Sequence, residues 1–323
     1  MRTEKITAGP FSFESGFPSL IENIGEDPNP AKALANIEPE HREMVRGLLE
    51  KTGAVLLRGF DVLTIDQFEE VARSLLGELA AYKGGDAPRH AERGLVYNAS
   101  GPDKTRAVRA HNELSYAPWH PATLVFGCSV VAEEGGATTI VDGHRVYTSL
   151  PSEVRDAFRE RGVTYIQHLP HAAGDPSGIK SWPETFETDS KEDVIAHCQA
   201  SYTSAKWTPL GLLTTNRTPG TVEVGADGRQ AWFNQTHIWR KDPSTVPDVT
   251  DMERWESWIG YGATFGDGTE IPGHYMELVR ETLETCEVAV EWEAGDVLLV
   301  DNRAAMHGRH PYSGDRQVFV AFA

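Results

Sequence analysis

The strongest constraint on the fold is the series of short strand-like segments that follows residue 95. These apolar or alternating stretches are separated by turns more often than by helices. One pair flanks Asp227–Gly228, a dipeptide typical of tight hairpins. The segments are Thr123–Val131, Ala137–Val141, Val163–Gln167, Thr221–Val224, Gln230–Phe233, Val288–Trp292, Val297–Asp301 and Gln317–Phe322. Because a doubly wound sheet needs a helix between successive strands, the pattern predicts an α+β, mainly β fold. We expect a double-stranded β-helix (jelly-roll) core with flanking and inserted helices.

The N-terminal part of the chain has a different pattern, in which helix and strand alternate. Pro39–Lys51 has apolar residues at helical spacing, and Ala54–Phe60 is a short apolar strand. Thr64–Gln67 forms a capping-box pattern ahead of a second predicted helix. No repeat or long linker divides the sequence. We therefore expect one jelly-roll domain over residues 1–323, with a helix–strand flank at about 1–95.

Charge, hydropathy and cysteine content restrict the partners of the chain. The formal net charge is −18 and no run of Lys or Arg occurs, so we expect no nucleic-acid binding. No segment approaches the apolar length of a membrane span, and the N-terminus lacks the apolar part of a signal peptide. We expect no membrane association and a cytoplasmic location. Cys128, Cys198 and Cys286 are far apart, which argues against a disulfide scaffold or a sulfur-rich zinc site.

The motif that indicates a catalytic metal site is a histidine two positions before a carboxylate. Open-site iron(II) oxygenases bind their metal through two histidines and one carboxylate, and residues i and i+2 of a strand share a face. Three such pairs occur: His41–Glu43, His90–Glu92 and His111–Glu113. With 12 histidines and 48 acidic residues in 323, chance alone gives roughly two matches, so the motif by itself is weak.

Sequence context separates the candidate pairs. His41–Glu43 lies in a predicted helix, where positions i and i+2 do not face each other. His90–Glu92 lies in a polar loop that would not hold two ligands rigidly. The context therefore favours His111–Glu113, at the start of the strand region. For the second histidine it favours His307, which follows an apolar strand, over His310, which lies further into a loop.

Five blocks in a fixed order give the chain a family likeness from about residue 50 to its end. They are Ala54–Phe60, His111–Tyr116, Glu133–Thr138, Trp232–Gln235 and Gly295–Arg309. Together they resemble the taurine dioxygenase/TfdA superfamily, and within it the clavaminate synthase-like and SyrP-like amino-acid hydroxylases. The resemblance implies an Fe(II)/2-oxoglutarate-dependent dioxygenase in which His111, Glu113 and His307 bind the iron. It implies no catalytic residue beyond this metal centre.

The resemblance also implies a binding site for the co-substrate 2-oxoglutarate. Thr138 matches the hydroxyl that contacts 2-oxoglutarate, and Arg316 matches the arginine that pairs with its distal carboxylate. A guanidinium suits that function because it donates two parallel hydrogen bonds to a carboxylate. The alternatives are a surface salt bridge for Arg316 and an ordinary strand residue for Thr138. Arg316 follows His307 closely, so Arg309 is a second candidate for the anchoring arginine.

The implied reaction consumes O2 and 2-oxoglutarate and hydroxylates an unactivated C–H of an amino acid or amino-acid derivative in specialised (natural-product) biosynthesis. The same chemistry can desaturate or cyclise a substrate, and an aminoacyl group on an acyl carrier domain is an alternative to a free small molecule. The acidic net charge favours the free molecule, because carrier domains are usually acidic too. Candidates for substrate contact, each with a structural alternative, are Tyr97, Asn98, Asn234 and Gln235.

Two rival functions are weaker. A cupin-like metalloenzyme without 2-oxoglutarate explains the His and Glu ligands but not Thr138 together with Arg316. A non-catalytic jelly-roll binding module leaves the paired ligands near strand ends unexplained.

Overall fold

The computed structural model describes residues 5–8, 11–82, 91–101, 103–240 and 251–323. Its largest sheet has nine strands, in which the flank and the C-terminal half of the chain are hydrogen-bonded to each other. All its strand pairs are antiparallel except β3 with β4. In spatial order the strands are β1 (Lys5–Ala8), β2 (Phe11–Glu14), β3 (Ser19–Asn23), β4 (Ala54–Arg58), β18 (Val297–Asp301), β8 (Thr123–Val130), β21 (Gln317–Phe322), β6 (Val96–Asn98) and β5 (Ala91–Arg93).

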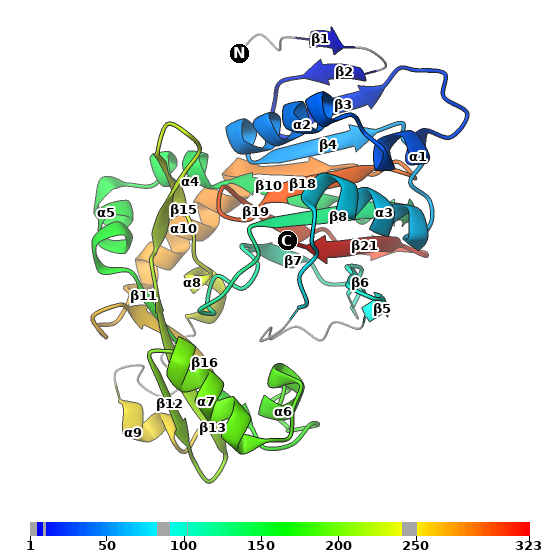
Figure 1. Cartoon of the computed structure of the whole chain (residues 1–323). Helices are drawn as coiled ribbons and strands as arrows, with labels where there is room; N and C mark the ends of the chain where they lie inside the picture. The colour runs from blue at the N-terminus through cyan, green and yellow to red at the C-terminus, as the bar shows by residue number, and fades with distance from the viewer. Residues whose placement is uncertain (1–4, 9–10, 83–90, 102, 241–250) are drawn as a thin grey trace.

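The central strands of this sheet are buried on both faces, which explains why they read as nearly continuous apolar runs. On β18, Val297 and Leu299 pack with the helices of the flank, while Leu298 and Val300 belong to the core on the opposite face. Figure 1 shows α2 and α3 lying along the sheet. The flanking helices are α1 (Pro30–Ala35), α2 (Pro39–Thr52) and α3 (Ile65–Leu76).

Both helices predicted in the flank are confirmed. Helix α2 ends at Gly53, whose φ of +81° is a left-handed conformation that glycine adopts without strain. Helix α3 begins with the expected capping box between Thr64 and Gln67. No helix of the described ranges is long and apolar enough to cross a membrane.

A four-stranded sheet and several helices contribute to the hydrophobic core on the other face of the nine-stranded sheet. Its spatial order is β17 (Glu287–Val290), β10 (Thr138–Asp142), β19 (Ala305–Arg309) and β7 (Val108–His111). The adjoining helices are α4 (Gly143–Ser149), α5 (Ser152–Arg161), α8 (Thr236–Trp239) and α10 (Gly273–Cys286). The small pairs are β14 (Thr221–Val224) with β15 (Arg229–Trp232), which is the predicted hairpin, and β20 (Tyr312–Ser313) with β9 (Glu134–Gly135).

A third sheet extends away from these layers and forms a separate lobe in Figure 1. It consists of β12 (Ser204–Trp207), β13 (Gly211–Thr218), β11 (Val163–Pro170) and β16 (Gly260–Phe265), in that order. The helices of this lobe are α6 (Trp182–Phe186), α7 (Lys191–Ser201) and α9 (Met252–Trp255). The prediction of a mixed fold dominated by strands, with flanking and inserted helices, is therefore confirmed. Among the strands that are described, the sheets stay open and none closes into a barrel.

Candidate metal centre

Three candidate metal ligands from distant parts of the sequence lie together between β7 and β19. His111 ends β7 and is the register partner of His307 on β19, and their ring centroids are 4.3 Å apart. Glu113 follows β7, and its Oε2 is 3.7 Å from Nε2 of His307. One donor atom from each of the three residues lies within 4.8 Å of the others. Two imidazoles and one carboxylate in this arrangement are the donor set that suits open-site iron(II).

A glycine beside His307 allows the two ligand strands to approach closely. A Cβ atom on Gly308 would lie 2.6 Å from the carbonyl oxygen of Val108 and 2.7 Å from Oγ1 of Thr139. Both distances are too short for a real Cβ contact, so a side chain at this position would push β7 or β10 away from β19. The spacing between the two histidine-bearing strands therefore depends on this residue.

The Glu113 backbone is held by Asn302, in the turn after β18. Oδ1 of Asn302 accepts a 2.7 Å hydrogen bond from the Glu113 N–H, and its Nδ2 donates to the Glu113 carbonyl at 2.9 Å. Asn112 in turn donates to the carbonyls of Asn302 and Ala305. Leu114 then adopts φ +56°, a conformation unusual for a non-glycine residue. These contacts fix the direction in which the Glu113 side chain points away from the backbone.

The side chains of the cluster are also oriented by hydrogen bonds. Nδ1 of His111 lies 2.9 Å from the carbonyl oxygen of Arg109. Since a carbonyl only accepts, Nδ1 carries the proton and Nε2 presents a lone pair to a metal. The Tyr82 hydroxyl donates to Oε1 of Glu113 at 3.3 Å. Glu113 and His307 are buried, whereas His111 is partly exposed.

Gln235 and His237 bracket the ligand-bearing segment from the side of α8. The Gln235 amide donates to the carbonyl of Asn112 at 2.7 Å and to Oγ of Ser115 at 3.0 Å. Nε2 of His237 donates to the carbonyl of Ala110 at 2.9 Å. Burial lowers the pKa of His237 to about 3, so this ring is a neutral donor at physiological pH. Gln235, for which a substrate contact stays a prediction, supports the backbone of the ligand-bearing segment, and the sequence reasoning missed the same function of His237.

The other three predicted substrate residues make structural hydrogen bonds. The Tyr97 hydroxyl accepts the Tyr82 N–H. Asn98 donates to Glu92 and accepts from the Ser100 N–H. Asn234 donates to the Gly220 carbonyl and accepts from the N–H and hydroxyl of Thr236. Each of these side chains therefore has a structural partner within the protein, and their contact with substrate stays a prediction.

A half-buried cation, Arg316, lies beside the predicted Thr138 hydroxyl. Nη2 of Arg316 donates to Oγ1 of Thr138 at 3.3 Å, and Nε donates to the Gly136 carbonyl at 2.9 Å. Trp292 also donates to Oγ1 of Thr138, at 3.0 Å. Because this oxygen accepts two donors, its own proton remains available for an acceptor such as a carboxylate. Strand β10 connects this group to the metal cluster, since it pairs Ile140 with His307.

Arg316 is not a surface salt bridge. It is half-buried, and within the described ranges no carboxylate forms an ion pair with it. Burial, with a smaller contribution from nearby Arg309, lowers the pKa of Arg316 to about 10, so it is still a cation at neutral pH. A half-buried, protonated guanidinium without an acidic partner among the described residues is a natural anion-binding group.

Arg309, the second candidate anchor, is buried and only partly engaged, since its Nε and Nη1 have no hydrogen-bond partner among the described residues. Its Nη2 donates to the carbonyls of Asp103 and Arg106, at 2.8 and 2.7 Å, and its guanidinium lies over the Tyr312 ring. It therefore fastens the loop that leads into β7. Its burial also lowers its pKa, and it adds positive charge near Arg316.

The competing histidine motifs have ordinary surroundings. His310 pairs with Glu287 at 2.8 Å and is substantially exposed. His41 packs against the Phe11 ring, while Glu43 pairs with Arg46 on the surface of α2. His90 lies outside the described residues. His41 and His310 thus lie apart from the metal cluster, whereas His111 and His307, which their sequence context favoured, lie within it.

Known proteins resemble this chain over most of its length. The model of the family described as taurine catabolism dioxygenase TauD, TfdA family matches residues 20–322. The dapdiamide synthesis protein DdaC of Enterobacter agglomerans is 27% identical over 277 residues, covering 85% of this chain and 83% of that protein. A clavaminate synthase-like protein of Arabidopsis thaliana is 31% identical over 315 residues, covering 94% and 93%.

The fold is similar to that of the PvcB protein from Pseudomonas aeruginosa. The TM-score is 0.58 at 14% identity, over 98% of this chain and 92% of that one. A second structure describes PvcB as an iron- and 2-oxoglutarate-dependent oxygenase from an isonitrile synthetic pathway. At this low identity the likeness shows a shared fold.

Proposed function

We propose, from the premise that this chain belongs to the taurine catabolism dioxygenase TauD, TfdA family, that it hydroxylates an amino acid or amino-acid derivative in specialised biosynthesis. The enzyme is an iron(II)- and 2-oxoglutarate-dependent dioxygenase that uses O2. The observation that carries the residue assignment is the convergence of the His111, Glu113 and His307 donor atoms within 4.8 Å. We further propose that the facing sheets form the jelly-roll core expected for this family.

In this proposal His111, Glu113 and His307 hold the iron and leave the remaining coordination positions to 2-oxoglutarate and O2. When bound, iron and 2-oxoglutarate together supply the oxidant from O2, with succinate and CO2 as by-products. The other residues of the protein hold these ligands in position. The hydrogen bond from Tyr82 orients one carboxylate oxygen of Glu113, and the contact with the Arg109 carbonyl orients the His111 ring and favours the tautomer with its proton on Nδ1.

Arg316 and Thr138 hold the distal carboxylate of 2-oxoglutarate in this proposal. The guanidinium offers charge and N–H donors, and the Thr138 hydroxyl has its proton to donate. Burial strengthens this recognition, because a charged hydrogen bond is screened less in a low-dielectric environment. Arg309 contributes to the local positive charge and fastens the neighbouring loop rather than serving as the anchor.

The proposed substrate is a small amino-acid-like molecule. DdaC, a dapdiamide synthesis protein, supports this class by similarity. The net charge of −18 favours a free substrate over one carried on an acidic acyl carrier domain. Desaturation or cyclisation by the same centre is the alternative reaction outcome.

The test is a panel of amino acids and their acyl or amide derivatives, incubated with iron(II), 2-oxoglutarate and isotopically heavy O2. We expect at least one compound to accelerate succinate release and to gain one heavy oxygen atom, as measured by mass spectrometry. Loss of two hydrogens without oxygen gain would identify desaturation or cyclisation instead. If 2-oxoglutarate is not consumed under any of these conditions, the proposed function is wrong.

A further inference from the structure

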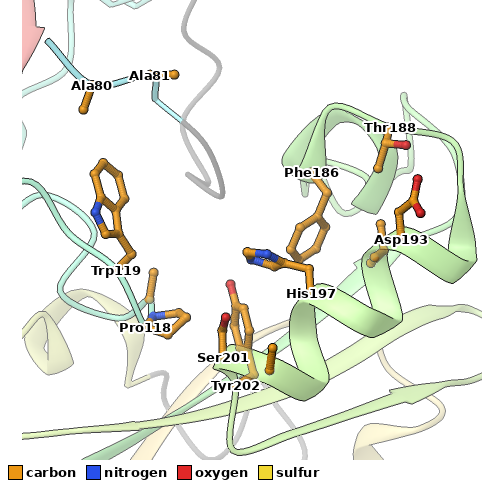
Figure 2. Close-up of a pocket in the computed structure, with 13 residues that line it drawn as sticks. Ala80, Ala81, Pro118, Trp119, Phe186, Thr188, Asp193, His197, Ser201 and Tyr202 are labelled. Carbon is orange, nitrogen blue, oxygen red and sulfur yellow. The ribbon is translucent and has the colours of Figure 1, made fainter.

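A large cleft lies between the lobe and the segment that follows Glu113. Its volume is about 760 Å³. Trp119 stands on one side, and Phe186, His197 and Tyr202 stand on the other, contributed by α6, α7 and the residue after α7 (Figure 2). The Trp119 side chain is conspicuous because 44% of it is exposed, although large aromatic side chains are usually mostly covered.

Two wall segments connect this cleft to the metal cluster. One wall contains Ala80 and Ala81, and the next residue, Tyr82, donates its hydroxyl hydrogen bond to Glu113. The other wall contains residues 117–119, which follow Glu113 within the same short segment. The cleft is therefore built by direct extensions of the backbone that positions the carboxylate ligand.

The chemistry of the lining selects against anions. Among the described lining residues no lysine or arginine occurs, and the carboxylate is that of Asp193. The His197 ring packs edge-on against Phe186 and Tyr202, and Ser201 adds a hydroxyl to the same side of the lining. Aromatic rings on opposite sides favour a flat apolar group between them.

We propose that this cleft binds the part of the substrate that is not oxidised, and that this part is a flat, apolar and uncharged group. The inference rests on the function proposed above and specifies its substrate class. The volume supports it, since pockets of roughly 300–1,000 Å³ have room for an amino-acid derivative that carries such a group. A sulfonate would find no cationic side chain in the described lining.

The experiment uses the full chain and two probes that share one ring, uncharged benzamide and anionic benzenesulfonate. Their dissociation constants are measured by ligand-observed NMR titration. Trp119→Ala removes one side of the cleft, and Ser201→Trp fills it from the exposed end of α7. Leu210→Ala is the control, because Leu210 is similarly exposed on the lobe but does not line the cleft.

We expect benzamide to bind the wild type, and both cleft variants to weaken it about tenfold, the order of magnitude of a well-placed aromatic contact. Leu210→Ala should bind like the wild type, and benzenesulfonate should bind far more weakly than benzamide. Benzamide binding that survives in both cleft variants, or equal binding of the two probes, would overturn the inference.

Failure of this inference is distinguishable from failure of the proposed function. The slow release of succinate without substrate depends on iron and 2-oxoglutarate, and it is measured in the wild type and in Leu210→Ala, which should retain it because Leu210 does not line the cleft. Wild-type protein that releases succinate but shows no cleft-dependent benzamide binding refutes the substrate class alone. Wild-type protein that never consumes 2-oxoglutarate refutes the function itself.

Discussion

Single residues decide how well the metal cluster is organised, and most of the deciding contacts are hydrogen bonds to backbone carbonyls. The sequence motif and the family resemblance together identified His111, Glu113 and His307, which the structure brings together. They did not identify Asn302 or His237 as supports. A hydrogen bond from a side chain to a carbonyl more than a hundred positions away leaves no local pattern in the sequence. For the same reason the sequence did not show that the Gln235 amide holds the Asn112 carbonyl, 123 positions away.

At this scale we predict that Arg316→Ala raises the 2-oxoglutarate requirement steeply. Losing one partner of a buried, charged hydrogen-bonded pair costs on the order of 2–5 kcal/mol. The concentration of 2-oxoglutarate at half-maximal succinate release should therefore rise at least about thirtyfold. Iron binding should change little, because Arg316 makes no contact with the three donor residues.

A matched pair of variants separates the two arginines. Arg316→Lys keeps a positive charge but loses the planar guanidinium, so it should also raise the requirement. Arg309→Lys should chiefly lower the melting temperature, because it loses the bonds to the Asp103 and Arg106 carbonyls. A larger effect on the 2-oxoglutarate requirement from Arg309→Lys than from Arg316→Lys would move the anchoring function to Arg309.

At the scale of elements, sequence patterns predicted what is locally encoded and missed what depends on distant partners. Helices α2 and α3 and the β14–β15 hairpin carry caps or turn residues, and the structure contains all three. Strand β13 was not predicted, since its Thr-, Asn- and Arg-containing sequence shows no clean apolar alternation. It forms because β11 and β12 pair along its two edges. Strands β1 to β3 were not predicted either. Strand β3 pairs in parallel with β4, and this pairing joins segments that are far apart in the chain.

The lobe contains a buried histidine that should make its stability sensitive to acid. Nδ1 of His168 donates to the carbonyls of Trp255 and Trp258, and its Nε2 contacts Oγ1 of Thr208. Burial lowers the pKa of His168 below the usual 6.5. The unfolded chain therefore takes up a proton that the folded chain resists. Stability from this group is fully present above about pH 6.5 and falls as the pH drops below it.

We predict that wild-type protein loses thermal stability between neutral and mildly acid pH more steeply than His168→Gln does. The glutamine removes the titrating ring while keeping an amide donor for the Trp255 and Trp258 carbonyls. Melting temperatures measured across this range for both proteins check the difference. Parallel pH profiles would show that His168 does not titrate in the way proposed.

At the scale of the whole molecule, strands from both ends of the sequence share the nine-stranded sheet. Strand β4 of the flank pairs with β18, which lies just before the second histidine ligand. We therefore propose that the flank at about 1–95 and the rest of residues 1–323 form one domain. A fold made mainly of β-sheets was predictable from the many short strand-like segments in the sequence. The open arrangement of the sheets was not, because strand order depends on pairings between distant segments.

The proposed activity depends on one iron ion held by residues from two parts of the chain. The most direct measurement is anaerobic absorption spectroscopy of the wild type with iron(II), before and after addition of 2-oxoglutarate. We expect a weak visible charge-transfer band that requires both, and we expect it to be lost in His111→Ala, Glu113→Ala and His307→Ala. His310→Ala, an exposed histidine near His307, should retain it. A wild type that binds iron without developing the band, or a band that persists in all three ligand variants, would contradict the account.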